Sequence, residues 1–275
     1  CTPSRGLGDV YKRQDIGNAS SRMKPKELEF CNKNGVKLTE IKVGYDGIVV
    51  ANSKKGILLK ISKSDLVKAL TAKIPQNGKW IDNPYKNWNE INPSLPNLPI
   101  RVYGPPTTSG TRASFVELVN QKGYCAKDKD AKAASLGRGD KKGKKCRAMR
   151  TDGAFIEAGE QDNLIVQKLN EDPNAYGIFG FSYLDQNSDT IQGAEISDTA
   201  PTFENIASNN YSVSRALYIY VKHQHIGVIP GLKKFLENWK LNWSEDGILS
   251  DAGMIPMSET ERAKYAKAIE AVSYT

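Results

Sequence analysis

The sequence lacks several features that would indicate a membrane protein or an enzyme. No uninterrupted run of about 18 apolar residues occurs, so no segment is expected to cross a membrane as a helix. The two histidines, His223 and His225, have no cysteine or carboxylate beside them, and neither is paired with Ser109 as the base of a catalytic triad would be. No Lys-Ser or Lys-Thr follows the glycine turns "GYDG" and "GVIPG", so no P-loop is expected. We therefore expect no catalytic residues, no metal and no cofactor.

Aromatic residues are missing from the most basic stretch of the chain. The net charge is +8, and residues 125–147 contain nine Lys or Arg. A surface that stacks nucleic-acid bases needs aromatic side chains among its cations. We therefore expect a solvated basic loop and no nucleic-acid partner, although net charge alone leaves a nucleic-acid-binding protein as an alternative.

Cysteine is also scarce, with four in 275 residues. Cys125 and Cys146 bracket the basic loop, either as a disulfide or as two unrelated thiols. A disulfide closing a loop of about 20 residues would stabilise the fold by roughly 3 kcal/mol.

The first fourteen residues, "CTPSRGLGDVYKRQ", have neither an apolar signal-peptide core nor an amphipathic pattern. Their end, "GDVYKRQ", resembles the translated read-through of a sequencing adapter. We expect residues 1–14 to be foreign to the fold, with Cys1 not a natural cysteine. The natural protein would then extend further before Asp15, and a signal peptide would be missing from this chain.

Helical and strand patterns alternate along the rest of the chain, which indicates an α/β protein. The pattern predicts five helices, at 24–35, 62–74, 160–175, 229–241 and 258–272, and strands at 36–52, 100–104, 176–184 and 215–222. A Pro- and Asn-rich connection is expected at 80–99.

The segment "GPPTTSGTRASF" (104–115) gathers hydroxyl donors where a further helix is expected to begin. Ser and Thr are good N-caps, and the first turn of a helix has unpaired N–H groups and a partial positive charge. These donors, with the guanidinium of Arg112, suit a tetrahedral oxyanion. An ordinary capped helix is the alternative.

Five segments in this order resemble the periplasmic phosphate-binding protein of the phosphate ABC transporter, which has the two-lobed type II periplasmic-binding-protein fold. They are "DIGNASSRM", "GYDGIVVAN", "YGPPTTSGTRASF", "NLIVQKLNEDPNAYGIFGFSYL" and "VSRALYIYVKH". The resemblance implies two α/β lobes joined by two hinge strands, with a ligand cleft between them. Lobe I would comprise 15–50 and 219–275, and lobe II would comprise 51–218.

The resemblance also implies which residues bind phosphate. The family's Ser-Gly-Thr motif corresponds to Ser109, Gly110 and Thr111, followed by Arg112, and the turn after the first strand contributes Ser20. Neighbouring residues with the same chemistry are further candidates: Thr108, Ser21 and Arg22.

One departure concerns selectivity against sulfate. Some members of the family have an aspartate where Ser20 stands, and it accepts the proton of hydrogen phosphate. A buried carboxylate repels fully ionised sulfate, whereas donors alone do not distinguish the two anions. Four acidic residues are candidates for this role: Asp15, Asp152, Glu160 and Asp162.

The resemblance implies an exported, monomeric, phosphate-binding protein that delivers its ligand to a membrane permease. A binder of another oxyanion (sulfate, molybdate or a phosphonate) and a phosphate-ester hydrolase are the alternatives. An oxidising compartment favours the Cys125–Cys146 disulfide. The partner of Cys31 would lie in the missing segment, so Cys31 is expected to be unpaired.

Overall fold

The structure is a computed structural model, and it describes residues 15–136, 144–159 and 161–273. The chain divides into two compact units. Unit 1 comprises Cys1–Asp46 and Arg215–Thr275, and unit 2 comprises Gly47–Ser214. Strands β2 (Leu38–Ser53) and β11 (Ser214–Lys222) contain the two points where the chain passes between the units. Residues 1–14, expected to be foreign to the fold, lie outside the described residues.

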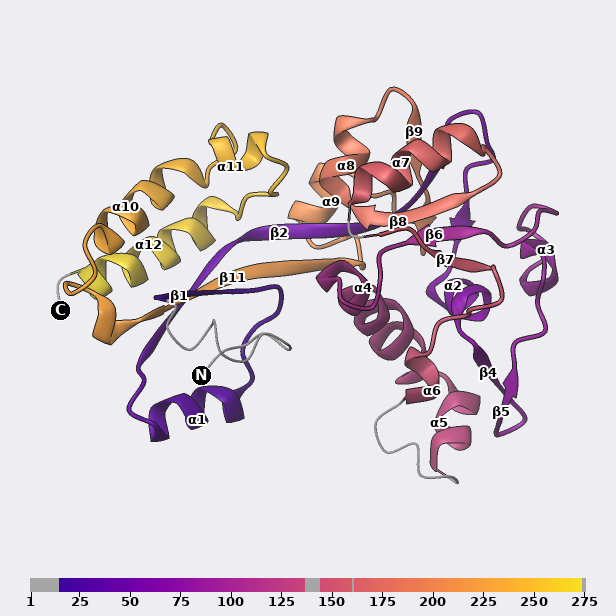
Figure 1. Cartoon of the computed structure of the whole chain (residues 1–275), viewed down its shortest axis with the longest axis horizontal. Helices are drawn as coiled ribbons and strands as arrows, with labels where there is room; N and C mark the ends of the chain where they lie inside the picture. The colour runs from indigo at the N-terminus through magenta and orange to yellow at the C-terminus, as the bar shows by residue number, and fades with distance from the viewer. Residues whose placement is uncertain (1–14, 137–143, 160, 274–275) are drawn as a thin grey trace. The chain divides into compact units, whose positions relative to one another are not determined.

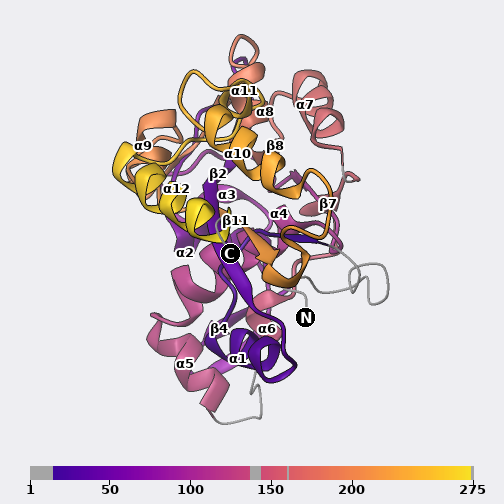
Figure 2. The ribbon, with the colours of Figure 1, turned by 90° about the vertical axis from the view of Figure 1, so that its left-hand side faces the viewer.

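Unit 1 is built on β11, which lies between β1 (Ile16–Ala19) and β2. Helices α10 (Leu232–Asn242) and α12 (Glu259–Ser273) lie side by side in Figures 1 and 2. Short elements η3 (His223–His225) and α11 (Ile248–Asp251) complete this part of the chain.

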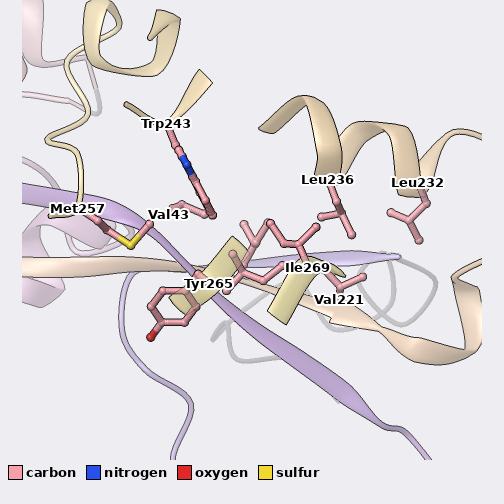
Figure 3. Packing of buried hydrophobic residues seen from close by; sticks show 10 residues of the cluster. Val43, Val221, Leu232, Leu236, Trp243, Met257, Tyr265 and Ile269 are labelled. Atoms are coloured by element: carbon pink, nitrogen blue, oxygen red, sulfur yellow. The ribbon is translucent and has the colours of Figure 1, made fainter. Parts of the chain in front are cut away.

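Alternating side chains of β11 separate two apolar clusters in unit 1, as expected for a strand whose successive residues point to opposite faces. Ile219 and Val221 pack with Leu236 of α10 and Ile269 of α12 in the larger cluster (Figure 3). Tyr220 belongs to the other cluster, to which helix α1 (Pro25–Lys33) contributes. Both faces of the strand are therefore covered.

Unit 2 contains a sheet with both parallel and antiparallel pairs. Strand β8 (Tyr176–Gly180) pairs antiparallel with β2 and parallel with β6 (Val102–Gly104), and β6 pairs parallel with β7 (Phe155–Glu157). Strand β9 (Ile191–Gly193) pairs with the end of β2. All five residues of β8 are buried, as expected for a central strand.

The helices of unit 2 follow in chain order: α2 (Lys63–Leu70), α3 (Trp88–Ile91), α4 (Gly110–Phe115), the π-helix η2 (Val116–Cys125), α5 (Lys129–Leu136), α6 (Lys144–Arg147), α7 (Asp162–Glu171), α8 (Phe181–Gln186) and α9 (Phe203–Ala207). Two small sheets accompany them, formed by β3 (Lys60–Ile61) with β10 (Glu195–Ile196) and by β4 (Lys73–Gln76) with β5 (Lys79–Asp82).

The α/β class is confirmed, but the structure differs from the expected elements around residue 70. Ser62 caps α2, accepting a hydrogen bond from the Asp65 N–H at 3.0 Å. The helix ends at Leu70 rather than near 74, because residues 73–82 form the β4–β5 hairpin. Part of the expected connection at 80–99 is therefore strand, and helix α3 lies within it.

The cysteine predictions have different outcomes. The Cys125–Cys146 disulfide is confirmed and links the end of η2 to α6. The expectation that Cys31 is unpaired is wrong, because Cys31 is disulfide-bonded and buried. That expectation assumed that its partner was missing from the chain.

Candidate anion site

The turn between β6 and α4 places the hydroxyl-rich motif at the start of a helix. Ser109 is the N-cap, and its Oγ accepts a hydrogen bond from the Thr111 N–H at 3.2 Å. Strand β6 ends at Gly104, where a Cβ atom would lie 2.6 Å from the ring of Phe155. A glycine is therefore required for the close packing of β6 against β7 beneath the motif.

The first turn of α4 is suited to an anion. It contains no acidic residue. Thr107, Thr108 and Gly110 are exposed, while Ser109 and Thr111 are partly buried, so a solute can reach the motif. Helix α4 continues directly into η2, so the helical run extends from Gly110 to Cys125. The aligned peptide dipoles add positive potential at its N-terminus.

Arg112 is buried beside this turn, with 7% of its surface exposed. Its Nη1 donates to the Pro105 carbonyl at 3.1 Å, and its guanidinium carbon lies 4.2 Å from the centre of the Phe155 ring. Glu157 lies 3.8 Å from Nη1, at ion-pair distance. Burial lowers the pKa of Arg112, and Glu157 partly offsets this. These contacts fix the guanidinium against the loop that precedes the motif.

The candidates in unit 1 follow strand β1, which pairs with β11 through Ala19 and Tyr218. Ser20, Ser21 and Arg22 are all exposed. The three candidates of unit 1 therefore lie together after β1, and the candidates at 108–112 lie together at the start of α4 in unit 2.

Arg22 is engaged by a carboxylate. Its Nε donates to the two carboxylate oxygens of Glu40 at 3.0 and 3.1 Å, which raises the pKa of Arg22. Glu40 also accepts from the Tyr220 hydroxyl at 2.9 Å, and that hydroxyl accepts from the Met23 N–H at 2.7 Å. The charge of Arg22 is thus largely balanced within unit 1.

The four candidate proton acceptors lie in different surroundings. Arg150 donates to Asp152 at 2.6 and 2.9 Å and lowers its pKa, so this carboxyl is poorly suited to accept a proton. Asp15 contacts His225 at 2.5 Å, and Asp162 accepts from the Gly180 N–H at 3.4 Å. Glu160 lies outside the described residues.

An ion pair in the two crossing strands was missed in the sequence. Asp46 of β2 accepts from Arg215 of β11 at 3.0 and 3.2 Å. Burial raises the pKa of Asp46, and the charge of Arg215 opposes this shift. The signal was a pair of opposite charges inside mostly apolar segments: Asp46 in "GYDGIVVAN" and Arg215 in "VSRALYIYVK".

The described residues include no group of three or more His, Cys, Asp or Glu side chains placed to hold a metal ion. No helix in the same part of the chain combines the length and apolar character needed to cross a membrane.

Comparison with known proteins found a family model and several relatives that match most of the chain. A model of the PBP superfamily domain matches residues 6–238. The protein SphX of Synechococcus elongatus is 30% identical over 231 residues, covering 80% of this chain and 58% of the relative. The phosphate-binding protein PstS of Staphylococcus saprophyticus is 25% identical and covers 81% of this chain and 59% of the relative. The chain thus spans less than two thirds of the length of these relatives.

Solved structures share the fold. A possible phosphate-binding protein from Planctomyces limnophilus superimposes with a TM-score of 0.67, at 22% identity, over 95% of this chain and 82% of that one. A putative phosphate ABC transporter substrate-binding protein from Clostridium perfringens, determined with bound phosphate, gives a TM-score of 0.58 at 22% identity, over 89% of this chain and 80% of that one.

Proposed function

The chain belongs to the PBP superfamily, and from this premise we propose that it captures inorganic phosphate outside the cytoplasm. It acts as a monomeric binding protein without catalytic activity, and it delivers phosphate to a membrane permease of the ABC type. The names of a relative and of a solved structure refer to phosphate binding, and this supports phosphate as the ligand.

The observation that carries the proposal is the capped start of α4. Ser109, Gly110 and Thr111 form the first turn, beside the buried Arg112 and without an acidic residue. Hydroxyl and amide donors at the positive end of a helix stabilise an anion without requiring a metal. Thr108 is a further candidate ligand in the same turn.

Ser20 in unit 1 is proposed as an additional phosphate ligand, with Ser21 beside it. Arg22 is a weaker candidate, because an anion that binds it would compete with Glu40 for the guanidinium. Asp15, Glu160 and Asp162 are the candidates for the carboxylate that accepts the proton of hydrogen phosphate. Asp152 is not among them, because it is engaged by Arg150.

Calorimetric titration with phosphate and with sulfate tests the ligand. We expect binding of phosphate and much weaker binding of sulfate. A preference for sulfate, molybdate or a phosphonate would instead support the alternative oxyanion.

Two substitutions test the site. Ser109→Ala and Thr111→Ala should each weaken phosphate binding by about 1.5–3 kcal/mol, the value of a hydrogen bond to a charged group. Thr202→Ala is a matched control, because Thr202 caps α9 in the same unit and accepts from the Asn205 N–H at 3.2 Å. It should lower stability through the lost cap but leave the affinity unchanged. Unchanged affinity in both site variants would exclude the turn as the binding site.

The alternative as a phosphate-ester hydrolase makes a different prediction. Turnover of p-nitrophenyl phosphate that disappears in the Ser109→Ala variant would favour a hydrolase over a binding protein.

A further inference from the structure

Lys63, the first residue of α2, joins two other parts of unit 2 through its ammonium group. Its Nζ donates to the Ser212 carbonyl at 2.7 Å and lies 3.4 Å from the Leu118 carbonyl. Leu118 belongs to η2, the continuation of α4, while Ser212 lies just before β11. One side chain therefore connects the helical run of the anion site with the start of a crossing strand.

The aliphatic part of the Lys63 side chain packs closely against a glycine of η2. A Cβ on Gly123 of η2 would lie 2.6 Å from Cδ of Lys63 and 2.7 Å from the Leu118 carbonyl oxygen. Burial, followed by the charge of Lys127, lowers the pKa of Lys63 to about 8. A cation at this position is thus costly, and the two carbonyl oxygens offset part of that cost.

The segment that receives this hydrogen bond is firmly held. The hydroxyl of Tyr211 donates to the Ile48 carbonyl at 3.0 Å, and the Ile48 N–H donates to the Val213 carbonyl at 2.9 Å. Tyr211 and Val213 are fully buried. Lys63 therefore attaches η2 to a fixed part of the core.

The helical run needs such an attachment because η2 is a π-helix of ten residues. This conformation is rare and intrinsically poor, so surrounding contacts must maintain it. Leu118 lies two turns along the run from Thr111. A shift of η2 would therefore move the first turn of α4.

We propose that Lys63 is a positioning residue for the phosphate site, holding the α4–η2 run in the orientation that binds the anion. This inference rests on the proposed function.

The carboxylates of the elements that contact Lys63 have other partners. Glu117 and Lys122 of η2 pair with each other at 2.6 Å, and Asp65 of α2 accepts from the Ser62 hydroxyl at 2.8 Å. Residues 209–214 contain no Asp, Glu, Lys, Arg or His.

The two tyrosines in these neighbouring elements have pKa values raised by burial, so Tyr124 and Tyr211 remain neutral near pH 8. Lys127 is the cation that acts on Lys63 from beyond the end of η2.

The test compares phosphate binding by the full chain and by its Lys63→Arg and Lys63→Met variants, using calorimetry between pH 7 and 9. At pH 7, Lys63→Met should weaken binding about tenfold, the usual scale for losing a charged hydrogen bond. Lys63→Arg should stay within about threefold of the parent, since a guanidinium also donates to carbonyls. Lys68→Met, on the same helix, should bind as the parent does.

The pH dependence separates positioning from a general loss of stability. The parent should lose affinity relative to Lys63→Arg as the pH rises through about 8, because the amine deprotonates and the guanidinium does not. The protonation of phosphate itself is common to both proteins, so it cancels in the ratio of their dissociation constants.

Two results would overturn the inference while leaving the proposed function intact. One is a folded Lys63→Met variant that binds phosphate like the parent. The other is a constant affinity ratio between the parent and Lys63→Arg from pH 7 to 9, which decides the question even if Lys63→Met does not fold. Absence of phosphate binding by the parent at every pH would overturn both proposals.

Discussion

Arg112 shows how a single residue can shape an anion site without being freely available to it. Its guanidinium rests on Phe155 and donates to the Pro105 carbonyl. The sequence predicted a cation here but not these contacts, since Phe155 lies far along the chain. The structure thus favours a supporting role for Arg112 in addition to its charge.

Replacing this residue by lysine tests that role. Arg112→Lys keeps the charge but loses the planar contact with Phe155, so phosphate affinity should fall by about 1 kcal/mol. Calorimetry on Arg112→Lys and on the exposed control Arg101→Lys would measure the difference. An equal affinity in parent and variant would leave Arg112 with a purely electrostatic role.

A second prediction at the scale of residues concerns Glu261 in unit 1. Glu261 accepts from Lys42 at 2.6 Å and from the Tyr45 hydroxyl at 2.8 Å. Burial would raise the pKa of this carboxyl, but the two donors outweigh it and lower the pKa. A carboxyl with a lowered pKa stabilises the fold at pH values above its ordinary pKa, and this contribution is lost as the pH falls through the folded value.

We therefore expect Glu261→Gln to lower the free energy of unfolding by about 1–2 kcal/mol at pH 7, allowing for partial exposure. The difference from the parent should shrink as the pH falls below about 4. Urea unfolding between pH 3 and 7 measures it, with Glu29→Gln as a control from an exposed pair with Lys33. A difference that stays constant with pH would contradict the assigned ion pair.

At the scale of elements, helices with clear caps were predictable and the irregular helix was not. The hydroxyl residues near the starts of α2 and α4 indicated where these helices begin, because an N-cap is a local interaction, and the caps in the structure are Ser62 and Ser109. The π-helix that begins at Val116 packs against α2 and ends at the disulfide of Cys125, and neither contact is visible in a local pattern. The β4–β5 hairpin was missed for a related reason, since α5 packs against both of its strands.

The disulfide at the end of η2 gives a prediction for this element. Replacing Cys125 and Cys146 together by serine should lower the free energy of unfolding by about 3 kcal/mol, because the closed loop restricts the unfolded chain. Chemical unfolding of the double variant under non-reducing conditions measures the loss without affecting the disulfide of Cys31. If the double variant is as stable as the parent, the disulfide does not stabilise the fold by restricting the unfolded chain.

At the scale of the whole molecule, the alternation of helical and strand patterns predicted the α/β class, and the resemblance carried by five ordered segments implied two lobes. The chain passes between the two compact units at 46/47 and 214/215, whereas the expected lobe boundaries were 50/51 and 218/219. Such boundaries are difficult to locate from sequence, because β2 and β11 are continuous strands across them. The Asp46–Arg215 pair lies at the observed passages, and a pattern of apolar residues does not reveal it.

Binding of phosphate should stabilise the whole chain, since a ligand that binds only the folded state shifts unfolding by mass action. At a phosphate concentration 100 times the dissociation constant, the gain should be about 2.7 kcal/mol. At roughly 2–4 °C per kcal/mol for a chain of this size, the melting temperature should rise by roughly 5–10 °C. Sodium sulfate at equal ionic strength controls for screening and for the general stabilising effect of such anions. Thermal unfolding of the parent and of Ser109→Ala in both salts separates the contributions: the parent should gain more in phosphate than in sulfate, and the variant should lose that excess. An equal gain in both salts for both proteins would mean that the anion acts through the solvent and not through the start of α4.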